Sequence, residues 1–177
     1  RLAAGRHEVL FLYRPDSFLD LYTRMFGDPW ARAAYVEPLF ADGLQAPALE
    51  LPYAPGSAWH LTAGPHIAWG YGSPRSALDF APPAPDGLRC TASSAWVTAS
   101  APGLVVRSER GQVLVDLDGD GYEQTGWVVL YMHIAADGRV PVGTLLAVND
   151  PIGHASCEGG KATGTHVHIA RKYNGEW

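Results

Sequence analysis

Apolar and polar residues alternate in short runs from residue 76 to the end of the chain. Alternation with a period of two is typical of half-buried strands, and glycine, proline and polar turn residues separate these runs. Because no helical pattern intervenes, the sequence predicts a mainly β fold with an antiparallel sheet or sandwich as its core. The predicted strands are Ser76–Phe80, Ala95–Ser100, Gly103–Ser108, Gln112–Asp116, Trp127–Ile134, Thr144–Val148 and Thr165–Arg171.

One clear helical pattern stands near the start of the chain. Asp16 or Ser17 can cap this helix, and Gly27 can end it. A further helical turn or two is expected within Trp30–Phe40. The apolar stripe that predicts the helix consists of Phe18, Leu21, Tyr22, Met25 and Phe26.

The stretch Ala41–Pro65 carries four prolines and no clear periodicity. It therefore predicts an irregular connection that wraps around the core rather than packing into it. We expect two parts: an N-terminal helical and irregular accessory segment over residues 1–58, and a β domain over residues 59–177.

Composition and charge narrow the function classes. Apolar residues make up 47% of the chain and charged residues 18%, which suits one folded domain and argues against disorder. The net charge of −5 gives no electrostatic case for binding nucleic acid, and no apolar run reaches the length of a membrane span. We expect a monomer. The chain begins with Arg1 rather than Met, so we expect a processed form or a trimmed piece that could have lost an export signal.

The two cysteines, Cys90 and Cys157, allow two interpretations. They are either separate buried thiols or one disulfide. We favour the disulfide because both lie in polar, loop-like sequence. A disulfide implies an oxidising, extracytoplasmic setting.

The most informative motif is Gly164-Thr165-His166-Val167-His168. Alternate side chains of a strand point to the same face, so His166 and His168 are expected side by side. Two imidazoles aimed at one point most often bind a metal.

Three further residues are candidates for the same site. His66 follows Gly64-Pro65 in a rigid loop, and His133 ends a predicted strand, on the face of Val129 and Tyr131. A lone histidine at such a position is more often a core residue that donates to a carbonyl. Asp79 lies in an apolar strand, where it either faces solvent at a sheet edge or ligates a cation.

Together these residues resemble the lysostaphin and LytM-type zinc endopeptidases, and within them the β-lytic and staphylolysin branch. The resemblance covers Trp59 to Lys172. It rests on the order of the histidines and on a first histidine followed thirteen residues later by aspartate. The sequence segments that carry the resemblance are Trp59-His60-Leu61-Thr62-Ala63-Gly64-Pro65-His66, Ser76-Ala77-Leu78-Asp79-Phe80 and Val140-Pro141-Val142-Gly143-Thr144.

The resemblance implies that His66, Asp79 and His168 ligate Zn²⁺ and leave one position open. Three protein ligands and an open position are what a catalytic zinc site requires. The resemblance further implies that His133 and His166 flank the metal, accept the proton of its water and stabilise the oxyanion. Which of the two acts as the base stays open.

Aromatic residues predict the wall of a substrate groove. Trp69 and Tyr71 lie in the glycine-rich loop between His66 and Asp79, and Tyr131 lies on the strand that leads to His133. We therefore expect Trp69, Tyr71 and Tyr131 to contact an extended peptide.

The segment Asp116-Leu117-Asp118-Gly119-Asp120 begins like a calcium-binding loop. An EF-hand would need glutamate at its twelfth position, where Trp127 stands, and the segment lies between strands. A Ca²⁺ site at Asp116, Asp118 and Asp120 and a plain acidic hairpin turn both stay open.

The function that follows is a secreted or cell-envelope zinc endopeptidase. Its expected substrate is the peptide of bacterial peptidoglycan cross-links, glycine-rich bridges being one option. Two alternatives stay open: a non-catalytic relative that regulates cell-wall hydrolases, and a β-module that binds peptidoglycan sugars or peptides with structural histidines.

Overall fold

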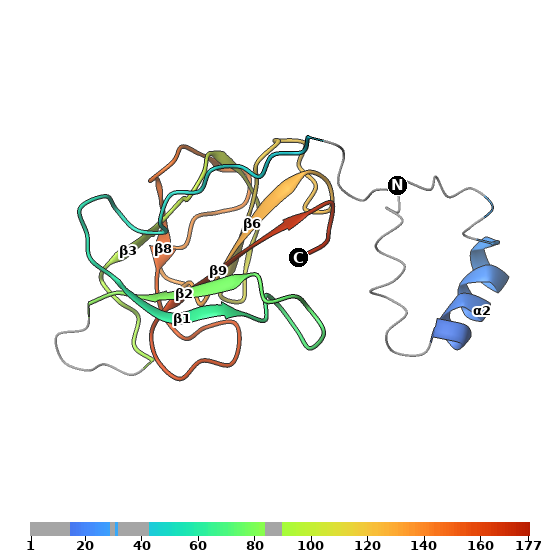
Figure 1. Ribbon diagram of the computed structural model, residues 1–177, viewed down its shortest axis with the longest axis horizontal. Coiled ribbons are helices and arrows are strands. Elements are labelled where there is room, and N and C mark those ends of the chain that lie inside the picture. Colours follow the sequence, from blue (N-terminus) through green and yellow to red (C-terminus); the bar gives the residue numbers. More distant parts are fainter. Residues whose placement is uncertain (1–14, 29–30, 32–42, 84–89) are drawn as a thin grey trace. The chain divides into compact units, whose positions relative to one another are not determined.

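The computed structural model describes residues 15–28, 31, 43–83 and 90–177 (Figure 1). Its contacts divide the chain into two compact units. One contains residues 1–46 with Glu176, and the other contains residues 47–175 with Trp177. The expected functional division between residues 58 and 59 stays a prediction.

The first unit contains helix α2, Pro15–Phe26. The helix begins at Pro15 because proline is tolerated in a first helical turn, so Asp16 and Ser17 lie inside the helix instead of before it. It ends at Gly27, which takes the left-handed conformation (φ 84°) and donates its N–H to the Thr23 carbonyl. The expected turns within Trp30–Phe40 lie almost wholly outside the described residues. No helix in the described ranges is long and apolar enough to cross a membrane.

The second unit is built from antiparallel strands, which confirms the predicted mainly β fold. Seven strands form one sheet in the order β1-β2-β9-β6-β5-β4-β7, and β3 pairs with β8 in a second sheet. In Figure 1, β9 runs between β2 and β6. The strands are β1 His60–His66, β2 Ala77–Ala81, β3 Trp96–Thr98, β4 Gly103–Glu109, β5 Gln112–Asp116, β6 Trp127–Met132, β7 Leu145–Leu146, β8 Pro151–His154 and β9 Val167–Tyr173.

Two of these strands were not predicted. Strand β1 lies in the stretch expected to be irregular; it is an edge strand with two register shifts and mostly exposed side chains, so it lacks an apolar alternation. Strand β8 is short and contains Pro151 and Gly153. Glycine is needed there because a Cβ at position 153 would lie 2.5 Å from the Ile134 side chain.

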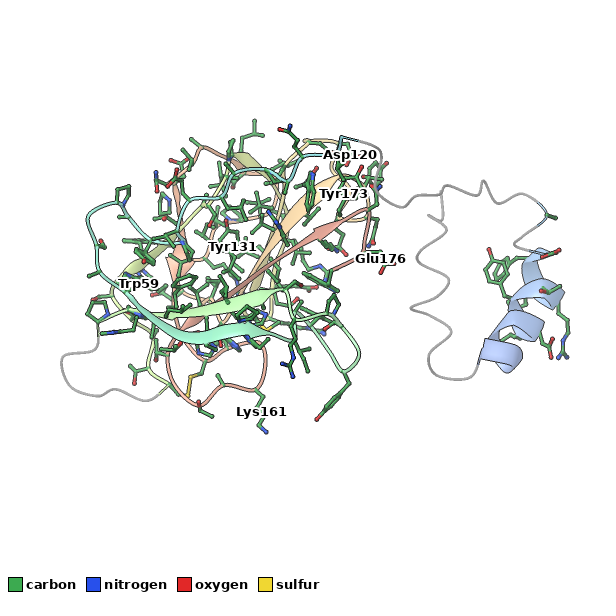
Figure 2. The ribbon with its side chains drawn as sticks, in the orientation of Figure 1. Trp59, Asp120, Tyr131, Lys161, Tyr173 and Glu176 are labelled. Atoms are coloured by element: carbon green, nitrogen blue, oxygen red, sulfur yellow. A yellow bond between two sulfur atoms is a disulfide. The ribbon has the colours of Figure 1, made fainter. Side chains whose placement is uncertain are left out.

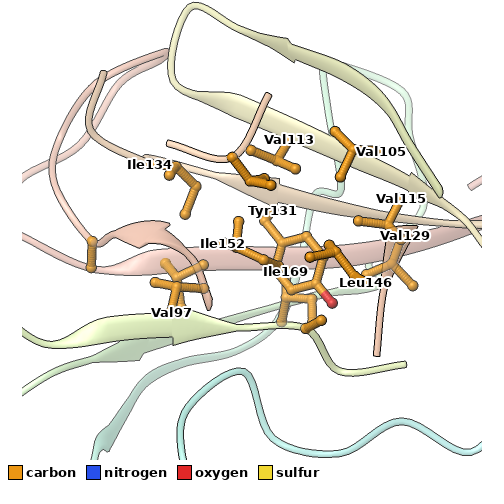
Figure 3. Packing of buried hydrophobic residues seen from close by; sticks show 14 of the residues in the cluster. Val97, Val105, Val113, Val115, Val129, Tyr131, Ile134, Leu146, Ile152 and Ile169 are labelled. Atoms are coloured by element: carbon orange, nitrogen blue, oxygen red, sulfur yellow. The ribbon is translucent and has the colours of Figure 1, made fainter. Parts of the chain in front are cut away.

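The core lies on one face of the large sheet, against the β3–β8 pair (Figure 3). Odd-numbered positions of β5, β6 and β9 fill it, and Tyr131 is fully buried among them. The even-numbered positions of these strands face the opposite side, where His168 lies. The odd-numbered core residues are Val113, Val115, Val129, Tyr131, Val167 and Ile169.

As predicted, a disulfide joins Cys90 to Cys157. The Cα atoms of the two cysteines are 5.0 Å apart. It fixes the segment between β8 and β9 to the segment that precedes β3. The segment after Cys157 leads directly to the candidate site.

Candidate metal centre

Three side chains from neighbouring strands converge on one point. His66 ends β1, Asp79 is central in β2, and His168 lies opposite Asp79 in the register of β9. His66 Nε2 lies 3.3 Å from Asp79 Oδ1, and His168 Nδ1 lies 3.0 Å from both that oxygen and His66 Nε2. The sheet ladder itself therefore brings the three atoms together.

Backbone carbonyls decide which ring nitrogen each histidine presents. His66 Nδ1–H donates to the Gly64 carbonyl (3.0 Å), and His168 Nε2–H donates to the Ala68 carbonyl (2.9 Å). A carbonyl only accepts, so these nitrogens carry the ring protons and the opposite nitrogens of the neutral rings keep lone pairs. Such carbonyl anchors are typical of histidines that bind a metal.

The donor set fits a zinc ion. Two imidazole lone pairs and a carboxylate oxygen repel one another at 3.0–3.3 Å unless a proton or a cation lies between them. Ligand atoms around tetrahedral zinc are separated by about 3.3 Å when each metal–ligand bond is about 2.0–2.1 Å long. The observed separations are close to that value.

The charge environment keeps Asp79 ionised. Burial by itself would raise the pKa of this carboxyl, whose residue is half-buried. The neighbouring His168, His166 and His66 outweigh burial and hold the pKa below its ordinary value. An ionised carboxylate is the form that binds a metal.

His166 and His133 lie beside this cluster. His166 Nε2 is 3.5 Å from Asp79 Oδ2, and its Nδ1–H donates to the Gly164 carbonyl at 2.7 Å. The His133 ring centre lies 4.4 Å from that of His166 and 6.3 Å from that of His168. His166 and His168 thus both face Asp79, as the strand periodicity predicts.

The position of His133 differs from the expectation. Strand β6 ends at Met132, and His133 takes a left-handed conformation with φ 67°. The chain therefore turns at this residue, and the ring joins the His168 side of the sheet instead of the core face of Val129 and Tyr131. Burial lowers the pKa of His133 to about 4, and the neighbouring His166 and His168 act in the same direction.

A groove of about 490 Å³ runs past the cluster. Trp69 and Tyr71 line it; Trp69 is about half exposed and Tyr71 almost fully exposed, and their contact with a substrate stays a prediction. Gly159, Gly160 and Lys161 line the groove as well. Figure 2 shows Lys161 projecting outward from its loop.

Tyr131 does not belong to this groove, contrary to the expectation. It is fully buried in the core (Figure 3), and its hydroxyl accepts the N–H of Ser100 at 2.7 Å. As an odd-numbered position of β6 it faces the core, whereas the even-numbered His168 faces the cluster. We therefore leave Tyr131 out of the proposed groove.

In the acidic loop that begins at Asp116, backbone N–H groups of the loop donate to its own carboxylates. The buried Asp116 carboxylate accepts the N–H groups of Asp118 (3.2 Å) and Gly121 (2.8 Å). Partial desolvation and a hydrogen bond with Asp116 raise the pKa of Asp118 to about 6. Oxygens of Asp116, Asp118 and Asp120 lie within 4.8 Å of one another, but nothing else in the described ranges supports calcium over an acidic turn.

Sequence reasoning missed the carbonyl anchors, which include the Glu158 carbonyl that accepts His133 Nδ1–H at 2.8 Å. It also missed Ser156, whose hydroxyl donates to the His133 carbonyl. Any residue has a carbonyl, so Ala68 and Glu158 carry no signal in the sequence. One signal was present: Gly64 and Gly164 each precede a histidine by two residues, and each accepts that histidine's Nδ1–H.

The sequence of this chain is similar to those of known metalloendopeptidases and of a protease. Protease LasA of Pseudomonas aeruginosa is 30% identical over 173 residues, which cover 90% of this chain and 39% of LasA. The β-lytic metalloendopeptidase of Lysobacter enzymogenes is 29% identical over 132 residues, which cover 73% of this chain and 71% of the relative. No family model matches the chain.

Solved structures share the fold. The M23 metalloprotease pseudoalterin superposes with a TM-score of 0.58 at 24% identity, over 75% of this chain and 74% of pseudoalterin. A zinc-containing peptidase from Vibrio cholerae gives a TM-score of 0.51 at 18% identity, over 73% of this chain and 38% of that chain. The chain spans about two fifths of the length of LasA.

Proposed function

The chain belongs to the LytM/lysostaphin-type (M23) family of metalloendopeptidases, and on that premise we propose that it is a zinc-dependent endopeptidase of bacterial peptidoglycan. The proposed reaction is hydrolysis of peptide bonds in the cross-links. The observation that best supports this proposal is the convergence of three atoms, which lie within 3.3 Å of one another: His66 Nε2, His168 Nδ1 and Asp79 Oδ1.

We assign His66, Asp79 and His168 as the zinc ligands. A zinc ion bound there would lower the pKa of a bound water and polarise a substrate carbonyl. With Asp79 as the single anionic ligand, the site would keep a net positive charge, which would favour the developing oxyanion. The carbonyl anchors at Gly64 and Ala68 hold both imidazoles in the ligating tautomer.

His133 and His166 are the proposed proton-transfer and oxyanion pair. Each ring donates Nδ1–H to a backbone carbonyl, so each can direct Nε2 toward the reacting groups. The low pKa of His133, about 4, leaves this ring neutral at neutral pH and able to accept a proton. The ring that has accepted this proton is then an imidazolium, which can donate the proton to the leaving amine.

The groove supports an extended peptide as substrate. Trp69 and Tyr71 offer an aromatic wall, and Gly159, Gly160 and Lys161 line the groove with them. Peptidoglycan as the source of that peptide follows from the family resemblance. The Cys90–Cys157 disulfide supports a place outside the cytoplasm, where such a substrate occurs.

Removal and return of zinc tests the proposal. The protein dialysed against a strong chelator should lose cleavage of purified peptidoglycan, and one equivalent of Zn²⁺ should restore it. Metal analysis should find one zinc per chain before dialysis. Cleavage that survives chelation would contradict the proposal, and a chain that holds no stoichiometric zinc and cleaves nothing would be a non-catalytic relative.

A further inference from the structure

Ser156 connects the two histidines that flank the metal site. Its backbone N–H donates to the His133 carbonyl (2.7 Å), and its own carbonyl accepts the His166 N–H (3.3 Å). Strands β6 and β9 pair directly up to Met132 and His168. Beyond that pair, the bridges Ile134–Ala155 and Ser156–His166 place the Ser156 segment between the residues that follow β6 and the residues that precede β9.

The Ser156 side chain completes a closed set of hydrogen bonds around His133. Its hydroxyl donates to the His133 carbonyl (2.9 Å) and accepts the Glu158 N–H (3.1 Å). The Glu158 carbonyl in turn accepts His133 Nδ1–H (2.8 Å). Only 3% of Ser156 is exposed, so water does not replace these bonds easily.

His133 needs such support because of its backbone. A non-glycine residue with φ 67° lies in the left-handed region, which side chains with a Cβ adopt only when the surrounding structure holds them there. Two donors from Ser156 fix the orientation of the His133 carbonyl, and that orientation defines the turn after β6. The same turn moves the His133 ring to the side of His166.

We propose that Ser156 is the positioning residue of the histidine pair. It holds His133 in the left-handed conformation and, through Glu158, keeps the ring proton on Nδ1. It also sets the separation of His133 from His166, because both backbones bond to it. This inference rests on the proposed function, in which His133 and His166 act on the metal's water.

Ser156→Ala removes the hydroxyl and leaves the backbone bonds. In the zinc-loaded protein we expect kcat to fall roughly 10- to 100-fold, with KM and zinc content unchanged. The matched control is Ser100→Ala, which truncates a serine that is equally buried (1% exposed) on the core side beside Tyr131. The control should keep the wild-type kcat.

Ring ¹⁵N signals of His133 provide a readout that does not need activity. Wild type should show a neutral ring with the proton on Nδ1, and Ser156→Ala should show a mixture of tautomers. Ser156→Thr restores a hydroxyl and should return both kcat and the ring signals toward wild type.

Three results would overturn the inference. One is wild-type ring signals and kcat in a folded Ser156→Ala protein, and another is a folded Ser156→Thr protein that restores neither quantity. The third is loss of zinc or of cooperative melting in both variants, which would make Ser156 a general structural residue. If wild type cleaves no peptidoglycan, the proposed function fails, and the ring signals still decide the role of Ser156.

Discussion

The two halves of the candidate site are held in different ways. His66, Asp79 and His168 lie on β1, β2 and β9, adjacent strands of one sheet, and Asp79 is the direct cross-strand partner of His168. His133 and His166 lie just outside strands, one after β6 and one before β9. The ligand half is therefore fixed by the sheet, and the flanking half by the segment around Ser156.

This difference separates metal binding from chemistry. Sheet ladders are among the most cooperative parts of a fold, so the ligands should keep their positions when a loop is disturbed. The flanking half depends on a left-handed residue and on a few hydrogen bonds from one segment. We expect changes in that segment to lower the rate while zinc stays bound.

The largest effect is expected when the ligand half is broken. His168→Ala removes one of three zinc ligands, so zinc content should fall to near zero and cleavage to background. Metal analysis and a peptidoglycan-cleavage assay measure both quantities. His154→Ala is the control, because this half-buried histidine packs on Trp96 and its Nδ1 bonds to the Ala95 carbonyl. Stoichiometric zinc in His168→Ala would remove this residue from the ligand set.

A smaller effect is expected when the flanking half is broken. His166→Ala and His133→Ala should each lower kcat by about 10²–10⁴-fold, the usual contribution of general acid–base catalysis, with zinc content unchanged. Steady-state kinetics beside metal analysis checks this. Loss of zinc from either variant would show that the two halves are not separate. If one variant loses far more rate than the other, that histidine is the general base.

The sequence predicted the shared face of His166 and His168 better than the position of His133. Strand periodicity places His166 and His168 on one face, and the structure brings both rings against Asp79. Periodicity also placed His133 on the face of Tyr131, which is wrong, because strand β6 ends at Met132 and His133 itself takes the left-handed conformation. The alternation of apolar and polar residues cannot predict a left-handed turn at a residue such as His133, because only glycine commonly marks such a turn in a sequence.

Other parts of the structure carry no local signal in the sequence. Strand β1 forms because β2 offers it an edge, although its exposed side chains and Pro65 hide it from any apolar pattern. The role of Ser156 depends on Glu158 and His133 meeting across a bend, which is a long-range effect.

The disulfide was predictable because the chain has two cysteines, both in polar loops.

The smallest effect on rate is expected when the disulfide is removed. This change tests most directly whether the ligand half and the flanking half of the site are supported separately. Cys157 lies between Ser156 and Glu158, so the bond to Cys90 fixes the segment that holds His133. The double variant Cys90→Ser/Cys157→Ser removes a link across 67 residues, which should lower the free energy of unfolding by about 4 kcal/mol. Because the ligands lie on sheet strands, zinc content below the melting transition should not change.

With zinc retained, kcat of that double variant should fall about two- to ten-fold, since the Ser156 segment gains freedom while its hydrogen bonds persist. Thermal melting, metal analysis and kinetics on one preparation separate these quantities. A double variant that loses zinc and rate in parallel would mean that the disulfide supports both halves. The loop would then be part of the metal site's own framework, and the division between ligand and flanking halves would fail.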